Sequence, residues 1–212
     1  MRLPNLLLTS LLVLMLASCA SSGTRIADYP SPIQALLVLD MQNDFVGADA
    51  RMPIREDSKL PLIAAVNDVA AFAAQKGILV IYIRNEFPRS DLANAFRNNA
   101  AIKCTPGSEL DPRVALVSQT VFDKDQPDAF SNPQLEAFLI AHQVNELVIA
   151  GVFADQCCAV TSQAALNRHY KVDYLVDGVG AGSRDSIQNA AASLRSQGAT
   201  ITTIDQWKSE RE

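Results

Sequence analysis

"LLVLDMQNDF", residues 36–45, joins a short apolar run to a group of acidic and amide side chains. We interpret residues 33–39 as a buried strand, because an uninterrupted apolar run of this length is typical of a strand that helices cover on both faces. The apolar run ends at Asp40, where acidic and amide side chains begin, so this residue is expected at the carboxyl end of the strand. The pattern favours a parallel sheet over an antiparallel sheet with one exposed face.

Comparable apolar runs recur along the chain and alternate with helical stretches. A turn-rich region at residues 84–115 is expected to be mostly loop. The alternation predicts an α/β fold: a Rossmann-like three-layer sandwich in which helices cover both faces of one six-stranded parallel sheet. The expected strands are residues 33–39, 78–83, 117–122, 146–150, 172–176 and 200–204, and the expected helices are residues 62–75, 135–142, 157–169 and 186–197.

Three chemically active side chains follow predicted strands. Asp40 follows the first strand, Lys124 comes just past the third, and Cys157 lies in the first helical turn after the fourth. Ligands of open parallel sheets bind at the carboxyl ends of the strands, so we expect these groups at one edge. Taken singly, Asp40 could cap a backbone amide, and Lys124 could be a surface charge among its acidic neighbours.

Two adjacent cysteines begin the helix that follows the fourth strand. The helix N-terminus favours a thiolate at Cys157, whereas Cys158 points about 100° away around the helix and is expected to be a packing residue. His142 and His169 fall in the last turns of their predicted helices, at the opposite edge of the sheet. Neither should reach the thiol, so Asp40 remains as the candidate base.

Composition limits the classes of partner. The chain has 212 residues, is 49% hydrophobic and carries a formal net charge of −5. This length and apolar content suit one domain with a substantial core. Scattered charges with a negative balance give no electrostatic reason to bind nucleic acid.

The N-terminal stretch "MRLPNLLLTSLLVLMLASC", residues 1–19, has the layout of an export signal: one basic residue, an apolar core and small residues. Its end resembles the bacterial lipobox, in which Cys19 is diacylated and becomes the mature N-terminus. Two or three acyl chains suffice for stable membrane anchoring. Ala20 rather than Asp follows, which favours the outer membrane, facing the periplasm. The expected segments are a lipoprotein signal peptide at residues 1–18 and the lipidated Cys19 with a flexible tether at residues 19–32.

Export would place the remaining cysteines in an oxidising compartment. The spacing of Cys104, Cys157 and Cys158 matches no disulfide framework and no zinc site, and it contains no C-x-x-C. From the residues alone, two functions without hydrolysis stay open. One is a thiol redox lipoprotein that uses Cys157 with Cys158 or Cys104, and the other is a non-catalytic lipoprotein that binds a small molecule.

Four motifs, in the same order, resemble those of the isochorismatase-like cysteine hydrolases, which include nicotinamidases, N-carbamoylsarcosine amidase, and biuret and ureidoacrylate hydrolases. The resemblance covers residues 33–204 and implies that residues 33–212 form one hydrolase domain. The four motifs are "LLVLDMQNDF" at residues 36–45, "TPGSEL" at 105–110, "KDQPDAFSNPQLEAFL" at 124–139 and "VIAGVFADQCCAVTSQAAL" at 148–166.

The resemblance implies a catalytic triad of Asp40 as general base, Lys124 as a charge-stabilising cation and Cys157 as nucleophile. It also implies a cis peptide bond between Val152 and Phe153, which turns the Phe153 N–H toward the site. That N–H and the N–H of Cys157 would form an oxyanion hole. Weaker candidates for substrate contact are Gln42, Phe45 and Phe130.

Departures from the family pattern narrow the expected chemistry. Nicotinamidases carry an Asp-x-His metal site after the second strand, but no histidine precedes His142 here. We therefore predict no metal and no cofactor, and nicotinamidase activity becomes less expected. Ala154 replaces the usual Thr, which alters a hydrogen bond near the site, and Cys158 replaces the usual Val.

The expected function is cleavage of a C–N bond in a small amide, carbamoyl or ureido compound through a thioester on Cys157. The namesake isochorismatases cleave a vinyl ether without a nucleophilic cysteine, so this thiol favours C–N chemistry. Many members of the family form dimers or tetramers, and the resemblance therefore also implies a homo-oligomer. No stretch of the chain identifies the substrate or the interface.

Overall fold

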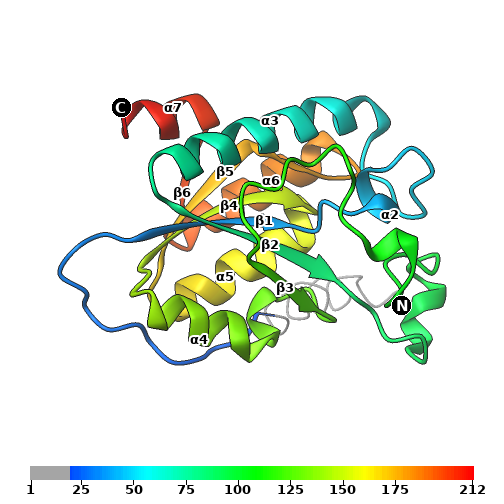
Figure 1. Cartoon of the computed structure of the whole chain (residues 1–212), viewed down its shortest axis with the longest axis horizontal. Coiled ribbons are helices and arrows are strands. Elements are labelled where there is room, and N and C mark those ends of the chain that lie inside the picture. The colour runs from blue at the N-terminus through cyan, green and yellow to red at the C-terminus, as the bar shows by residue number, and fades with distance from the viewer. Residues whose placement is uncertain (1–19) are drawn as a thin grey trace, which may run out of the picture.

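Six parallel strands form one sheet in the computed structural model, which describes residues 20–212 (Figure 1). Their order is β3–β2–β1–β4–β5–β6, and every pairing is parallel. This confirms the predicted α/β fold. The expected signal peptide and the lipidated Cys19 lie outside the described residues. The strands are β1 (Gln34–Leu39), β2 (Leu79–Asn85), β3 (Val121–Lys124), β4 (Glu146–Val152), β5 (Lys171–Gly180) and β6 (Thr200–Thr202).

Helices cover both faces of the sheet. In Figure 1, α3 and α7 lie above the sheet, and α4 and α5 lie below it. The second face also receives α6, whose Ala191 and Leu194 belong to the same core cluster as residues of α4 and α5. The helices are α2 (Asn43–Val46), α3 (Glu56–Gln75), α4 (Pro133–Ala141), α5 (Ala159–Asn167), α6 (Arg184–Ser196) and α7 (Ile204–Ser209).

Two apolar cores lie on opposite sides of the sheet because side chains alternate along each strand. In β1, Leu36 and Val38 join the core under α3, whereas Ala35, Leu37 and Leu39 join the core under α4, α5 and α6. All five side chains are fully buried. The continuous apolar run of β1 is therefore explained by helices on both of its faces.

The strand order reverses between β1 and β4. The chain runs outward from β1 through β2 to β3 and then returns, so that β4 pairs with the free side of β1. Leu39, the last residue of β1, lies between Ile83 of β2 and Gly151 of β4. The segments that leave β1 and β4 therefore diverge from neighbouring points at the carboxyl edge, which is where open parallel sheets bind ligands.

The third strand differs from its predicted position. It spans Val121–Lys124, so the expected strand at residues 117–122 begins too early and ends too soon. Before β3, side chains add to a backbone bond from the Tyr82 N–H to the Thr120 carbonyl: Ser118 Oγ donates to the Val80 carbonyl, and Val117 N–H donates to Tyr82 Oη. Lys124 is the last residue of the strand.

One helix and one further strand also differ from the predictions. The helix expected from residue 62 begins at Glu56 and continues through Pro61, whose missing N–H removes only one hydrogen bond near the exposed end of the helix. The strand expected at residues 200–204 ends at Thr202, and a capping box between Thr203 and Gln206 starts α7. No helix within residues 20–212 is both long enough and apolar enough to cross a membrane.

The expected tether, residues 20–32, is partly fastened to the body. Ser21 donates to Asp128 Oδ2 from its N–H at 2.8 Å and from its hydroxyl at 2.6 Å, and its carbonyl accepts from Arg168 at 3.0 Å. Gly23 lies so close to Arg168 that an added Cβ would come within 2.4 Å of the guanidinium. Residues 21–23 are therefore held against the body, because Ser21 donates to a carboxylate and Gly23 leaves room for the arginine.

Gly151 offers a test of the packing between β1 and β4. Its φ is +114°, and an added Cβ would lie 2.0 Å from the Leu39 carbonyl oxygen. We expect Gly151→Ala to lower the free energy of unfolding by more than about 3 kcal/mol, because backbone strain adds to a clash that no rotamer relieves. Urea unfolding measures the change. Gly182→Ala is the matched control: its Cβ would meet nothing within 4 Å, and a comparable loss there would contradict this explanation.

Candidate active site

Three side chains that the sequence predicted at one edge lie in direct contact. Lys124 Nζ donates to Asp40 Oδ2 at 2.9 Å and to Cys157 Sγ at 3.4 Å. Asp40 directly follows β1, Lys124 ends β3, and Cys157 follows β4. Neither the Asp40 nor the Lys124 side chain is exposed to solvent, and Cys157 is buried. The topology thus brings a carboxylate, an ammonium and a thiol into one buried cluster.

Asn85, the last residue of β2, is a fourth member that the sequence did not reveal. Lys124 Nζ donates to Asn85 Oδ1 at 2.6 Å, and Asn85 Nδ2 lies 3.7 Å from Cys157 Sγ as a donor. The signal that could have found it is the rule that identified Asp40: a polar residue at the carboxyl end of a buried strand.

Gln42 holds the backbone of Asn85. Gln42 Oε1 accepts from Asn85 N–H at 2.8 Å, and Gln42 Nε2 donates to the carbonyls of Asn85 and Ser108 at 2.7 and 2.6 Å. Gln42 was expected to contact substrate, but its side chain is fully buried and both amide groups are engaged by backbone. Its placement favours a supporting role for this amide.

The electrostatics of the cluster favour a carboxylate, an ammonium and a neutral thiol. Burial raises the pKa of Asp40 above its ordinary value, although Lys124 opposes the rise. Burial likewise raises the pKa of the Cys157 thiol to about 11, again opposed by Lys124. For Lys124, burial alone would lower the pKa, but Asp40 and Cys157 together raise it. Transfer of a proton from Cys157 to Asp40 would therefore leave the net charge of the cluster unchanged.

One oxygen of Asp40 is left for that proton. Asp40 Oδ1 is buried and accepts no hydrogen bond from residues 20–212, whereas Oδ2 is taken by Lys124. Buried polar atoms without partners are rare in folded proteins. The unpartnered oxygen identifies Asp40 as a group with acceptor capacity to spare beside the thiol.

Cys157 lies in an unusual turn. Residues Ala154–Cys158 form a π-helical turn that leads directly into α5, and such turns are frequent at functional sites. The peptide bond between Val152 and Phe153 is cis, at the position that the resemblance implied. The Phe153 carbonyl accepts from the N–H groups of Gln156 and Cys158, and the N–H of Cys157 is not among those donors.

The aromatic candidates lie in different surroundings. Phe45 and Phe153 are buried and meet edge to face, with ring centroids 5.4 Å apart. Phe45 therefore lies beside the turn that carries Cys157. The ring of Phe130 instead packs against Tyr170 and the Arg168 guanidinium. That packing gives Phe130 a role in the core under α5 and does not support the expected substrate contact.

In the described part of the chain, the other cysteines and the two histidines make no hydrogen bond to Asp40 or Lys124. Cys104, Cys157 and Cys158 are free thiols, and Cys158 is fully buried in the core. His142 follows the last turn of α4, and both His142 and His169 are exposed. No group of three His, Cys, Asp or Glu side chains within residues 20–212 has a geometry that could hold a metal ion.

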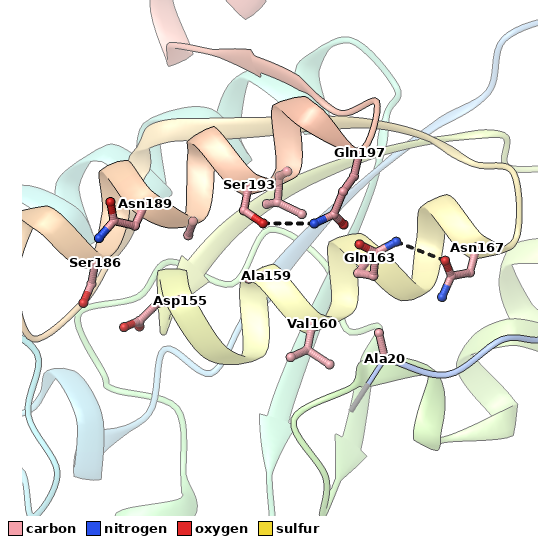
Figure 2. Close-up of a pocket in the computed structure, with 12 residues that line it drawn as sticks. Ala20, Asp155, Ala159, Val160, Gln163, Asn167, Ser186, Asn189, Ser193 and Gln197 are labelled. Carbon is pink, nitrogen blue, oxygen red and sulfur yellow. Dashed lines mark hydrogen bonds between the residues drawn. The ribbon is translucent and has the colours of Figure 1, made fainter. Parts of the chain in front are cut away.

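A surface groove lies next to the site without containing the triad. It has a volume of about 740 Å³ and runs between α5 and α6 (Figure 2). Its walls combine amide and hydroxyl side chains, including Gln163, Ser193 and Gln197, with small apolar ones such as Ala159, and it meets the turn that carries Cys157 only at Asp155. A smaller hollow of about 290 Å³ reaches Lys124 at the β3 edge.

Known proteins resemble this chain in sequence and in fold. A protein named as a probable inactive nicotinamidase from Arabidopsis thaliana is 29% identical over 188 residues, which make up 83% of this chain and 95% of that protein. Nicotinamidase from Escherichia coli strain K12 is 24% identical over 84% of this chain and 98% of its own length. The crystal structure of an isochorismatase-like hydrolase from Alkaliphilus metalliredigens matches the fold with a TM-score of 0.78, at 24% identity, over 85% of this chain and all of the other.

The isochorismatase domain matches residues 34–206, which include β1 and extend through β6 into α7. This span contains Asp40, Lys124 and Cys157 as well as the whole sheet. The chain therefore belongs to the isochorismatase family of hydrolases.

Proposed function

We propose that this protein hydrolyses a C–N bond of a small amide, carbamoyl or ureido compound through a thioester on Cys157. The observation that carries the proposal is one buried ammonium, Lys124 Nζ, in contact with both the Asp40 carboxylate and the Cys157 sulfur. A nucleophile activated by an adjacent base, with the base oriented by a third group, is the general arrangement for covalent catalysis. The redox alternative would require a reversible disulfide, and Cys104, Cys157 and Cys158 are all free thiols.

The first half-reaction forms the thioester. Asp40 Oδ1 takes the proton of the Cys157 thiol, and the thiolate adds to the substrate carbonyl carbon. The tetrahedral intermediate then collapses: the C–N bond breaks, and Asp40 returns the proton to the leaving ammonia or amine. The unpartnered Oδ1 is the atom with capacity for both transfers.

The second half-reaction releases the acid. Asp40, again a carboxylate, takes a proton from water as the water oxygen adds to the thioester carbonyl. The C–S bond breaks and the proton returns to the sulfur, which restores the resting thiol. Lys124 stays protonated throughout and stabilises whichever partner, Asp40 or Cys157, carries the negative charge.

The oxyanion of both tetrahedral intermediates would be bound by the N–H groups of Phe153 and Cys157. A single donor of this kind typically contributes about 3 kcal/mol of transition-state stabilisation. Phe45, which packs against Phe153, would form an apolar wall beside these donors. A small carbonyl compound with an uncharged reacting group fits such surroundings.

The first prediction compares the two adjacent cysteines. Cys157→Ala should abolish ammonia release because it removes the nucleophile, whereas Cys158→Ala should keep the rate within a few-fold because that side chain only packs in the core. Ammonia release by the mature protein would be measured with aliphatic amides, ureido compounds and nicotinamide. Undiminished hydrolysis by Cys157→Ala would contradict the thioester mechanism, and equal losses in both variants would point to packing as the cause.

The second prediction concerns pH. Asp40 must be a carboxylate to accept the thiol proton, and burial raises its pKa above the ordinary value. We therefore expect kcat/KM to be full above this raised pKa and to fall as pH decreases through it, at a higher pH than for an ordinary aspartate. Asp40→Asn should lose activity at every pH and show no such limb. A profile that stays flat into the range of an unperturbed carboxylate would contradict the role of Asp40.

We also propose that Cys19 is lipidated and anchors the protein in a bacterial envelope, with the hydrolase domain facing the periplasm. The apolar run of residues 6–17 and the Leu-Ala-Ser-Cys sequence at 16–19 support this. Cys19→Ser should shift the protein from the membrane fraction to the soluble fraction or leave it as an unprocessed precursor. Unchanged membrane association, with no lipid on the N-terminal peptide in mass spectrometry, would contradict it.

A further inference from the structure

Asn85 bridges the two reactive partners of the cluster. It ends β2 in register with Lys124 of β3, and it is 2% exposed. Its Oδ1 accepts from Lys124 Nζ at 2.6 Å, and its Nδ2 lies 3.7 Å from Cys157 Sγ. No step of the proposed reaction transfers a proton to or from this amide, so its place at the centre of the cluster requires another explanation.

The orientation of the amide is determined by Lys124. A protonated lysine only donates hydrogen bonds, so the amide must present its oxygen to the ammonium. The NH2 group is then directed to the opposite side, toward the sulfur. An N–H donor is the partner that favours a thiolate over a thiol, because it stabilises negative charge.

The backbone of Asn85 is fixed from outside the cluster. Gln42 accepts from the Asn85 N–H and donates to its carbonyl, at 2.8 and 2.7 Å, as a neighbouring strand would. The same Gln42 amide donates to the Ser108 carbonyl at 2.6 Å and so ties the loop before β3 to the end of β2. Both backbone polar groups of Asn85 are therefore held, which fixes the position from which its side chain extends toward the sulfur.

We propose that Asn85 is a positioning residue that stabilises the Cys157 thiolate through its Nδ2 hydrogen bond, and that Gln42 holds Asn85 in place for this purpose. The proposal rests on the proposed function in taking Cys157 as the nucleophile. It adds a neutral donor to the triad and assigns Gln42, expected as a substrate contact, to the support of that donor.

The other groups that face the sulfur explain why a neutral donor suits this position. Lys124 from β3 favours the thiolate, Asp40 after β1 disfavours it, and the neighbouring Cys158 thiol is buried. The nearby Asn85 amide lowers the pKa of both Asp40 and Cys157. The amide can thus stabilise the negative charge both on Asp40, before the proton transfer, and on Cys157, after it. A second cation in its place would hold the charge more strongly on Asp40.

Thiol reactivity tests the proposal without any substrate. Iodoacetamide, a small neutral electrophile, would be applied across a range of pH to the full protein carrying Cys104→Ser, which removes the exposed thiol. The same protein with Cys157→Ala gives the blank. We expect Asn85→Ala to slow alkylation of Cys157 about tenfold at neutral pH, as loss of a hydrogen bond to a charged group implies.

Two further variants test the direction of the effect. Asn85→Asp should slow alkylation more than Asn85→Ala does, because it adds a carboxylate beside the thiolate. Gln42→Leu should slow it less, because Asn85 keeps its amide and loses only its support. Asn85→Ala should also move the acid limb of kcat/KM to higher pH, a change that general loosening of the fold would not produce.

Asn94→Ala is the matched control. Asn94 is also buried, at 4% exposure, but its amide donates to the Pro88 carbonyl, and none of its hydrogen bonds involves the triad. Its loss should reduce thermal stability and leave the alkylation profile unchanged. Thermal unfolding would be recorded for every variant, and Asn85→Ser replaces Asn85→Ala if the alanine variant does not fold.

The outcomes separate this proposal from the proposed function. If Asn85→Ala alkylates at the parent rate at every pH, or if Asn94→Ala slows alkylation equally, the positioning role is wrong. If Asn85→Ala slows alkylation while the unmodified protein releases no ammonia from any amide, the proposed function fails and the role of Asn85 stands. If amides are hydrolysed and substitution of Asn85 leaves the alkylation rate unchanged, only the positioning role of Asn85 is overturned.

Discussion

The whole carboxyl edge of the sheet depends on one buried ammonium. Lys124 Nζ has no access to water, so the free energy of removing its charge from solvent must be offset by partners inside the protein. Those partners come from the ends of β1 and β2 and from the turn after β4: Asp40, Asn85 and Cys157. A single charge therefore fixes the relative positions of three chain segments that are distant in sequence. Removing one partner from such a pair typically costs about 3 to 5 kcal/mol, which ties the geometry of the site to the stability of the fold.

Topology explains why these partners meet. Because β4 returns to the free side of β1, the residues after β1 and β4 leave the sheet at adjacent points. Gly151 has no side chain where β4 passes the Leu39 carbonyl, which allows the close approach of the two strands. Asp40 and Cys157 are thus placed by backbone packing, while Lys124 and Asn85 approach from the two strands on the other side of β1.

Much of this arrangement could be predicted from the sequence, for identifiable reasons. The fold followed from continuous apolar runs, and the meeting of Asp40, Lys124 and Cys157 followed from their positions after predicted strands. Boundaries were less predictable where side-chain hydrogen bonds extend the pairing of two strands, as at Ser118 before β3, or where a capping box begins a short helix, as at Thr203. Asn85 was missed because a neutral amide at a strand end has many structural roles. The surroundings of Gln42 and Phe130 depend on long-range contacts with Ser108 and Arg168, which local patterns do not contain.

The fastening of Ser21 and Gly23 to the body has a further geometric consequence. A free chain of the length of residues 20–32 would let its far end wander by roughly 20 Å from the start of β1. With Ser21 held by Asp128 and Arg168, the position of the chain at residue 21 is set by α5 and by the loop after β3. Anything joined to the preceding residues would therefore meet the domain beside α5 and that loop. If that attachment is a lipid in a bilayer, as proposed above, this part of the domain would lie nearest to the membrane.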